Sequence, residues 1–520
     1  MHLSIVDIVV VAAYAVGIFL LAQWVSREKP GHVKNSQDYF LAGRTLPWWA
    51  IGTSLIAANI SAEQIIGMSG SGYVIGLGIA SYEWMSALTL IIVGKFFLPI
   101  FLKNNISTMP EFVRRRYGRS VQLVLAIFWL GVYVFVNLTS ILWLGATAFH
   151  TVTGIPIETG LIVLGAFAGA YALYGGLKAV ALTDVVQVSL LVLGGLVIVY
   201  IALDRISGGH GVVAGFTTLT HRFPGHFRMI LPPSDPNYKD LPGLSVLFGG
   251  LWVMNVTYWG FNQYIIQRAL AAKSTREAQR GIVLAAFLKL LMPVLVVLPG
   301  IAALVLAPHL ARPDQAYPQL MTFLPSGLLG LVFAALLAAI IASMGSKINS
   351  VATIFTIDLY KQAVPKASER HLVIVGRLAA VTALITAMLA AKPLLGNFDQ
   401  AFQYIQEFTG FFTPGIGVIF LLGMFWPRAT SASAMAAAIA SVTVSFAYKI
   451  WWPQIPFMNR IGYAFLICLG LAVVISLAQR PKARTSTIDV NNIDYSTTAG
   501  FNLAAVVICA ILVALYAIWW

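Results

Sequence analysis

Polar and ionisable side chains stand inside long apolar stretches of this 520-residue chain. An ionisable group in such a stretch is costly, and it usually faces a partner or a water-filled cavity. A buried ion pair without any ligand would explain each single residue equally well. Because we expect the whole set to converge on two interrupted apolar segments, we interpret it as a binding site. Its members are Glu63, Gln64, Glu83, Asp184, Lys289, Lys347 and Gln406.

The overall composition requires that a membrane surround these residues. The chain is 59% hydrophobic and only 10% charged, whereas a soluble domain carries roughly 25% charged residues. Its net charge is +14, but the basic residues lie in short loops between apolar runs, as the positive-inside rule expects. This distribution excludes nucleic acid as a partner and predicts contact with a lipid bilayer.

Apolar runs of spanning length follow one another along the whole chain, about fourteen in number. The first run lacks a basic leader and a cleavage site, so we expect a retained helix rather than a signal peptide. The Lys and Arg residues of the loops favour both termini on the outside. The runs are 5–25, 48–69, 78–102, 121–148, 158–176, 180–203, 246–267, 281–306, 328–360, 373–391, 401–426, 431–452, 461–478 and 501–520.

The second and seventh runs are interrupted by Asn, Ser, Gln and Gly, and each opens a block of five spans. Interrupted segments at matching positions of two halves point to a transporter site at the membrane midplane. Because an odd number of spans separates them, the second block enters the membrane from the opposite side. We therefore expect an all-α membrane protein with an inverted five-plus-five repeat core and two broken helices. Its parts are a first helix and loop (1–47), the first repeat (48–203), an external loop (204–245), the second repeat (246–426) and three peripheral helices (427–520).

Several segments resemble the sodium/solute symporter family, including its bacterial sugar transporters. They are "DYFLAGRTLPWWAIGTSLIAANISAEQIIGMSGSG", "SYEWMSALTLIIVGKFFLPIF", "YALYGGLKA", "YWGFNQYIIQRALAAK" and "AFQYIQEFTG". The resemblance runs from the first span to the last. It implies one helix before the core and three after it, and sodium-coupled import of a hexose, galactose or glucose, across a bacterial inner membrane. It implies sodium as the coupling ion and no organic cofactor.

The resemblance also implies a sugar site. Acceptors, donors and two-way amides suit a ligand with several hydroxyls. Glu83 and Lys289 could instead simply pair with each other. Tyr258 would stack on the sugar ring as an inner gate, and Met68 and Phe402 would form an outer gate. The implied sugar-binding residues are Gln64, Glu83, Ser86, Asn255, Tyr258, Lys289 and Gln406.

The implied sodium site uses the carbonyls of Ala57, Ile60 and Ala339 and two adjacent hydroxyls. The sequence keeps Ser343 but has Ala342 where close relatives carry a second serine. Because a hard cation prefers a shell of oxygen ligands, the sodium affinity of this chain is in question.

Lys347 is a second departure, since relatives carry an apolar residue there. It lies one turn beyond Ser343 on the same helix face, and about 20 Å from the helix end near Tyr360. We consider three hypotheses. Lys347 pairs with Asp184, an acid linked to sodium release in the family, and sodium coupling persists. Alternatively, its ammonium replaces sodium and the carrier is proton-coupled or uncoupled. In the third, Lys347 only contributes to packing.

Other functional classes find less support. No nucleotide phosphate loop, catalytic triad or metal cluster stands out, so we expect no enzyme and no ATP-driven pump. A nutrient sensor built on the same fold is the alternative from another class. A channel fits the paired broken helices less well than a carrier does.

Overall fold

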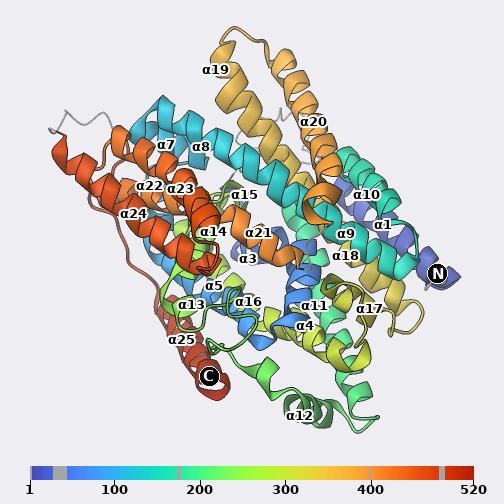
Figure 1. Ribbon diagram of the computed structural model, residues 1–520. Coiled ribbons are helices and arrows are strands. Elements are labelled where there is room, and N and C mark those ends of the chain that lie inside the picture. The colour runs from blue at the N-terminus through green and yellow to red at the C-terminus, as the bar shows by residue number, and fades with distance from the viewer. Residues whose placement is uncertain (1–2, 27–43, 173–176, 397–399, 480–486) are drawn as a thin grey trace.

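The computed structural model describes residues 3–26, 44–172, 177–396, 400–479 and 487–520. These residues form a helical bundle (Figure 1), and their only β-type pairing is an isolated bridge between Leu46 and Ala272. The first half comprises α1 (Ile5–Ser26), α3 (Trp48–Asn59), α4 (Met68–Val74), α5 (Ser81–Ile92), α6 (Leu98–Lys103), α7 (Met109–Tyr117), α8 (Arg119–Gly131), α9 (Thr139–Thr153), α10 (Ile157–Ala172), α11 (Leu177–Ile206) and α12 (Val212–Arg222).

The second half begins with two short helices and continues with longer ones. It comprises α13 (Ser245–Phe248), α14 (Gly250–Phe261), α15 (Gln263–Leu270), α16 (Thr275–Leu306), α17 (Ala316–Met321), α18 (Leu328–Thr353), α19 (Lys361–Ala363), α20 (Glu369–Leu395), α21 (Ala401–Thr409), α22 (Thr413–Phe425), α23 (Ser431–Trp451), α24 (Phe457–Ala478) and α25 (Ala499–Trp519).

Nine described helices are long and apolar enough to cross a membrane, or up to ten if α21 and α22, bent by 47°, count as one span. The chain is therefore a multi-pass membrane protein. The count is below the fourteen apolar runs of the sequence for a physical reason. Two runs account for part of the difference, because 48–69 and 246–267 are each divided into pieces shorter than a span.

Both interrupted runs are broken helices, as expected. Helix α3 ends where Ile60 becomes extended (φ −69°, ψ 105°), and a π-helical turn, η2 (Glu63–Gly67), then leads into α4. Helix α14 ends where Asn262 becomes extended (φ −80°, ψ 122°), and α15 follows at once. A helix end leaves backbone groups without partners inside the helix, so each break exposes polar backbone in the middle of an apolar run.

Helix α16 packs against α3, α4, α5 and α11 at the centre of the bundle. Its contact with α4 depends on Gly300, because a Cβ atom there would lie only 2.1 Å from the carbonyl oxygen of Ser69. Such close helix contacts need small residues in membrane bundles. This packing fixes the first broken helix against the second half of the chain.

Both ends of the chain lie toward the end of the bundle that carries α12 and α17, while α7 and α19 lie at the opposite end (Figure 1). The Asp7 carboxylate accepts hydrogen bonds from the Gly327 and Gly330 amides at the start of α18, at 2.7 and 2.8 Å. The Trp519 carbonyl accepts from the Met229 amide at 2.7 Å, in the segment after α12. Both termini therefore lie toward the same end of the bundle.

Candidate functional site

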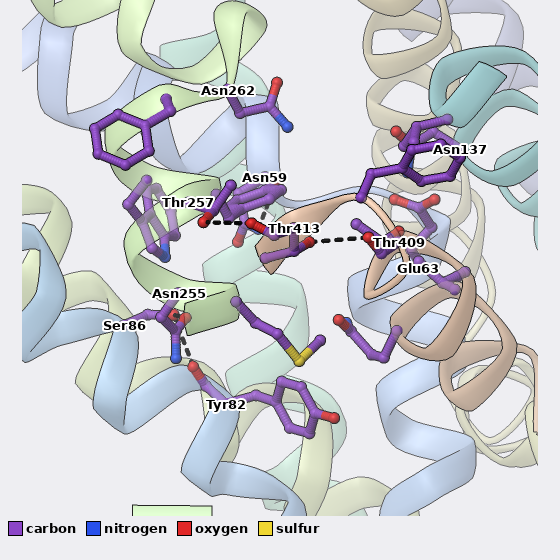
Figure 2. A pocket seen from close by; sticks show the side chains of 18 of the residues that line it. Asn59, Glu63, Tyr82, Ser86, Asn137, Asn255, Thr257, Asn262, Thr409 and Thr413 are labelled. Carbon is purple, nitrogen blue, oxygen red and sulfur yellow. Dashed lines mark hydrogen bonds between the residues drawn. The ribbon is translucent and has the colours of Figure 1, made fainter. Parts of the chain in front are cut away.

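A cavity lies where the two broken helices meet α5, α21 and the π-helical turn η5 (Val132–Leu138). It leaves about 120 Å³ for the centres of water-sized molecules, whereas one water needs only about 10–15 Å³. The lining is partly aromatic and partly polar (Figure 2). Its polar members include Asn59, Glu63, Gln64, Glu83, Ser86, Asn137, Asn255, Asn262, Gln406 and Thr409.

Most residues of the predicted sugar site line this one cavity, as do both outer-gate residues. Lys289 is different, because its side chain is fully buried behind Glu83 and is not among the lining residues. The predicted residues that line the cavity are Gln64, Met68, Glu83, Ser86, Asn255, Tyr258, Phe402 and Gln406.

Glu83 contacts side chains from α16 and η2, and it is linked to α3 through Lys289. Its Oε2 lies 2.5 Å from the Lys289 ammonium on α16, and its Oε1 accepts from the Gln64 amide at 2.6 Å. The same ammonium donates to Asn59 on α3 and lies 5.1 Å from the Trp259 ring centroid. Glu83 and Lys289 therefore form an ion pair, and the contact of both residues with sugar remains a prediction.

The aromatic residues close two sides of the cavity. The Phe402 ring meets the Tyr82 ring edge to face, with centroids 5.1 Å apart. On the other side, the Tyr258 hydroxyl accepts from Asn59 at 3.1 Å and from the Tyr264 hydroxyl at 3.0 Å. Both sides thus place an apolar ring beside polar groups, which suits a ligand with a C–H face and hydroxyl edges.

Four polar atoms of lining residues have no hydrogen-bond partner in the described structure. They are the Glu63 Oε1, Tyr82 hydroxyl, Asn255 Nδ2 and Thr409 Oγ1 atoms. The other side of the Asn255 amide is engaged, since its Oδ1 accepts from Ser86 at 2.7 Å. Buried polar atoms normally have partners. These four atoms belong to lining residues, but they have almost no accessible surface in the cavity.

The predicted sodium residues lie on two elements that pack together, α3 with its break and α18. Ala57 is in the last turn of α3, and Ile60 is the extended residue that ends it. Ala339 and Ser343 are one turn apart on α18 and both are buried. The hydroxyl of Ser343 accepts a hydrogen bond from the Lys347 ammonium at 3.1 Å.

The predicted pairing of Lys347 with Asp184 is wrong. The Lys347 ammonium lies 3.7 Å from the Glu63 carboxylate instead. Asp184 accepts from the Ser54 hydroxyl at 2.7 Å and lies 3.8 Å from the Arg268 guanidinium. Arg268 is buried on α15. It supplies the positive charge beside Asp184 that the sequence analysis assigned to Lys347.

Sequence reasoning missed several residues of the cavity. Asn59 lies inside the interrupted run 48–69, and Glu63 was identified as a costly residue but given no role. Both could therefore have been assigned to the site from the sequence. Tyr82 and Tyr264 are aromatic residues near selected ones, but their types alone do not distinguish packing from ligand contact. Asn137 comes from η5, which carries no sequence signal for this site.

Residues 39–441 match the Sodium:solute symporter family. The chain is 52% identical to the sodium/glucose cotransporter of Vibrio parahaemolyticus, over 100% of this chain and 99% of that protein. It is 33% identical to the sodium/myo-inositol cotransporter 2 of Mus musculus, over 83% of this chain and 68% of that protein.

Two solved structures share the fold. One is a Na+-coupled sialic acid symporter in a substrate-bound outward-open state, with a TM-score of 0.78 and 21% identity over 92% of this chain and 99% of that one. The other is Mhp1, a nucleobase-cation-symport-1 family transporter, with a TM-score of 0.53 and 15% identity over 89% of this chain and 100% of that one. The family match over most of the chain, together with a full-length relative at 52% identity, shows that the chain belongs to the sodium:solute symporter family, whose members are transporters rather than enzymes.

Proposed function

We propose that this protein is a sodium-coupled symporter that imports a hexose, galactose or glucose, across a bacterial inner membrane by alternating access. Family membership and the similarity to a Vibrio sodium/glucose cotransporter support transport of this class. The observation that carries the choice of ligand is the lining of one cavity, in which carboxylate, amide and hydroxyl groups stand beside aromatic rings. A site built to hydrogen-bond hydroxyls discriminates strongly against analogues that lack them.

The charges around the cavity favour a neutral ligand. Its two carboxylates are Glu63 and Glu83, and each has one buried ammonium within ion-pair distance, Lys347 and Lys289 respectively. A ligand with a net charge would leave an uncompensated charge in a buried site, which is costly. A neutral polyhydroxylated solute avoids that cost.

For the architecture we propose fourteen spans, with an inverted five-plus-five core over 48–203 and 246–426. Residues 1–47 and 427–520 would be peripheral, and 204–245 would form an external loop with both termini outside. The broken helices α3–α4 and α14–α15 at the start of each half support this arrangement. In such folds one repeat moves against the other around a fixed midplane site.

For sodium we propose a site formed by the carbonyls of Ala57, Ile60 and Ala339 and the hydroxyl of Ser343. The four residues belong to α3, its break and α18, two helices that are in contact, and oxygen ligands suit a hard cation. Sodium can drive uptake only if it binds the outward-facing state more tightly than the inward-facing one. Asp184 then acts on the ion through its contact with Ser54 on α3.

A second candidate is a proton-coupled or uncoupled sugar carrier in which the Lys347 ammonium replaces sodium. The hydrogen bond from this ammonium to Ser343 favours it, as does Ala342, which supplies no side-chain oxygen. A nutrient sensor of the same fold would bind hexose without moving it.

Uptake of radiolabelled galactose and glucose into proteoliposomes, with sodium and proton gradients imposed separately, tests these proposals. Sodium-coupled symport predicts accumulation driven by inward sodium alone. Accumulation with protons alone, or mere equilibration, would establish the second candidate. Binding without uptake or counterflow would establish a sensor, and neither binding nor uptake of a hexose would exclude the proposed substrate.

A further inference from the structure

The ammonium of Lys347 lies between the proposed cation site and the sugar cavity. It donates a hydrogen bond to Ser343 at 3.1 Å and stands 3.7 Å from Glu63 on the π-helical turn η2. Its side chain is 1% exposed, and the Tyr264 ring centroid lies 4.9 Å away. A single buried cation thus contacts both a proposed sodium ligand and a residue that lines the cavity.

Glu63 is the member of this group that reaches the ligand space. It lines the cavity on the side opposite Ser86 and Asn255, beside Asn137 (Figure 2). Its Oε1 atom has no hydrogen-bond partner. Its Oε2 atom lies 3.7 Å from the Lys347 ammonium. A charge-assisted hydrogen bond between ammonium and carboxylate is typically shorter, about 2.7–2.9 Å. Lys347 and Glu63 therefore form an ion pair whose two charged groups are farther apart than hydrogen-bond distance.

A sodium ion at Ser343 would place a second positive charge beside this ammonium. Like charges repel strongly where water is excluded, and the ammonium has a nearby carboxylate toward which it can move. Closing the gap to Glu63 would fix the carboxylate and the η2 turn at the edge of the cavity. By reciprocity, a sugar that holds Glu63 in this position would also favour sodium at Ser343.

We propose that Lys347 and Glu63 couple the cation site to the sugar cavity: bound sodium displaces the Lys347 ammonium from Ser343 onto Glu63, which prepares the cavity for sugar. This inference rests on the proposed sodium-coupled function and assigns Lys347 as a positioning residue. It also explains how a lysine is compatible with a sodium site, since the ammonium has an alternative partner when the ion binds.

The test is equilibrium binding of radiolabelled galactose and glucose to the purified full-length protein, with and without sodium at constant ionic strength. The readout is the coupling factor, the ratio of the sugar Kd without sodium to the Kd with it. Such factors are typically about 5 to 150. We expect Lys347→Met and Glu63→Gln each to lower the factor by about fivefold or more, and the double variant to lower it no further.

Lys347→Met should in addition lower the sodium concentration that gives half-maximal thermal stabilisation without sugar, because a competing charge is removed. Asp358→Asn is the matched control. It alters a buried carboxylate that accepts from Gln122 at 2.6 Å, away from the cavity, and should keep the wild-type factor.

Two outcomes separate the inference from the function. If sodium enhances hexose binding equally in wild type and both variants, the Lys347–Glu63 link is overturned while sodium-coupled sugar transport stands. If sodium does not enhance hexose binding to the wild type, the proposed function itself is overturned. Hydrogen exchange of residues 60–68 tests the Lys347–Glu63 link in the wild-type protein, without any variant. Sodium alone should slow exchange there, and unchanged exchange would overturn the link.

Discussion

Two buried lysine–glutamate pairs flank the cavity, and they differ in how the ammonium is held. In the first, Lys289 lies 2.5 Å from Glu83. In the second, Lys347 lies 3.7 Å from Glu63 and gives its hydrogen bond to Ser343. The residue types are the same and both ammoniums are buried. The difference therefore lies in the distance between the charges and in the other partners of the lysine.

A buried ion pair can therefore either hold a site in one geometry or let the site change when an ion binds. The ammonium of Lys289 is engaged by Glu83 and Asn59, so any movement would break short bonds in a medium where replacements are scarce. The Lys347 ammonium can exchange one partner for another at little cost. We assign the first pair to the shape of the sugar site and the second to its dependence on the ion.

The largest effect should come from breaking the tight pair. Lys289→Met leaves Glu83 as a buried charge without its counter-ion, and removing one partner of such a pair costs about 3–5 kcal/mol. We expect a clear drop in the thermal unfolding midpoint of the purified protein and loss of measurable hexose binding.

The double variant Lys289→Met/Glu83→Gln separates these two losses. Without a stranded charge, the unfolding midpoint should return toward the wild type, while hexose binding should stay lost because the carboxylate acceptor is absent. Full hexose binding by the double variant would show that this pair only supports the fold.

Removing the charge of the loose pair should have a smaller effect. In Glu63→Gln, the ammonium of Lys347 keeps its bond to Ser343, and the new amide oxygen can still accept from it. We expect a loss of about 1–2 kcal/mol in unfolding free energy, in the range of a hydrogen bond to a charged group. Thermal unfolding side by side with Lys289→Met measures the difference. Equal losses in the two variants would contradict the distinction between the pairs.

The sequence predicted much of this arrangement, since costly residues in apolar runs limit the possible partners. The broken runs 48–69 and 246–267 follow from the unusual polarity of their segments, whereas the assignment of residues to a sugar site came from the family resemblance. Lys347 was identified as exceptional for the same reason. Such predictions succeed because polar groups in lipid must face a cavity or another polar group.

What the sequence did not predict was the choice of partner. Lys347 was paired with Asp184 rather than with Glu63, because spacing along the chain does not say which helices become neighbours. Arg268 directly follows the apolar run 246–267, and the packing of α15 against α3 buries it beside Asp184. Three-dimensional packing decided both pairings.

Restoring an oxygen beside the loose pair should sharpen the comparison further. Ala342 is buried next to Ser343 on α18, and Ala342→Ser offers sodium one more ligand. We expect the sodium concentration for half-maximal hexose uptake to fall about tenfold, the effect of roughly 1.4 kcal/mol. Ala335→Ser adds a hydroxyl to the same helix two turns earlier and is the matched control. An unchanged sodium requirement in Ala342→Ser would place the ion elsewhere.

The smallest effect is expected for an ion pair that is much shorter than the loose buried pair but is exposed to water. Lys103 lies 2.8 Å from Asp489, in the segment between α24 and α25. Its hydrogen bond, followed by that of the Asn491 amide, holds the pKa of Asp489 below the usual value of 3.8. A carboxyl with a depressed pKa stabilises the fold above its unfolded pKa, and this contribution is lost as the pH falls through the lower folded value. At neutral pH, water screens the pair, so Asp489→Asn should leave the unfolding midpoint almost unchanged, and the small difference should vanish in acid below pH 3.8. A drop as large as that of Lys289→Met would mean that distance, rather than burial, determines the strength of these pairs.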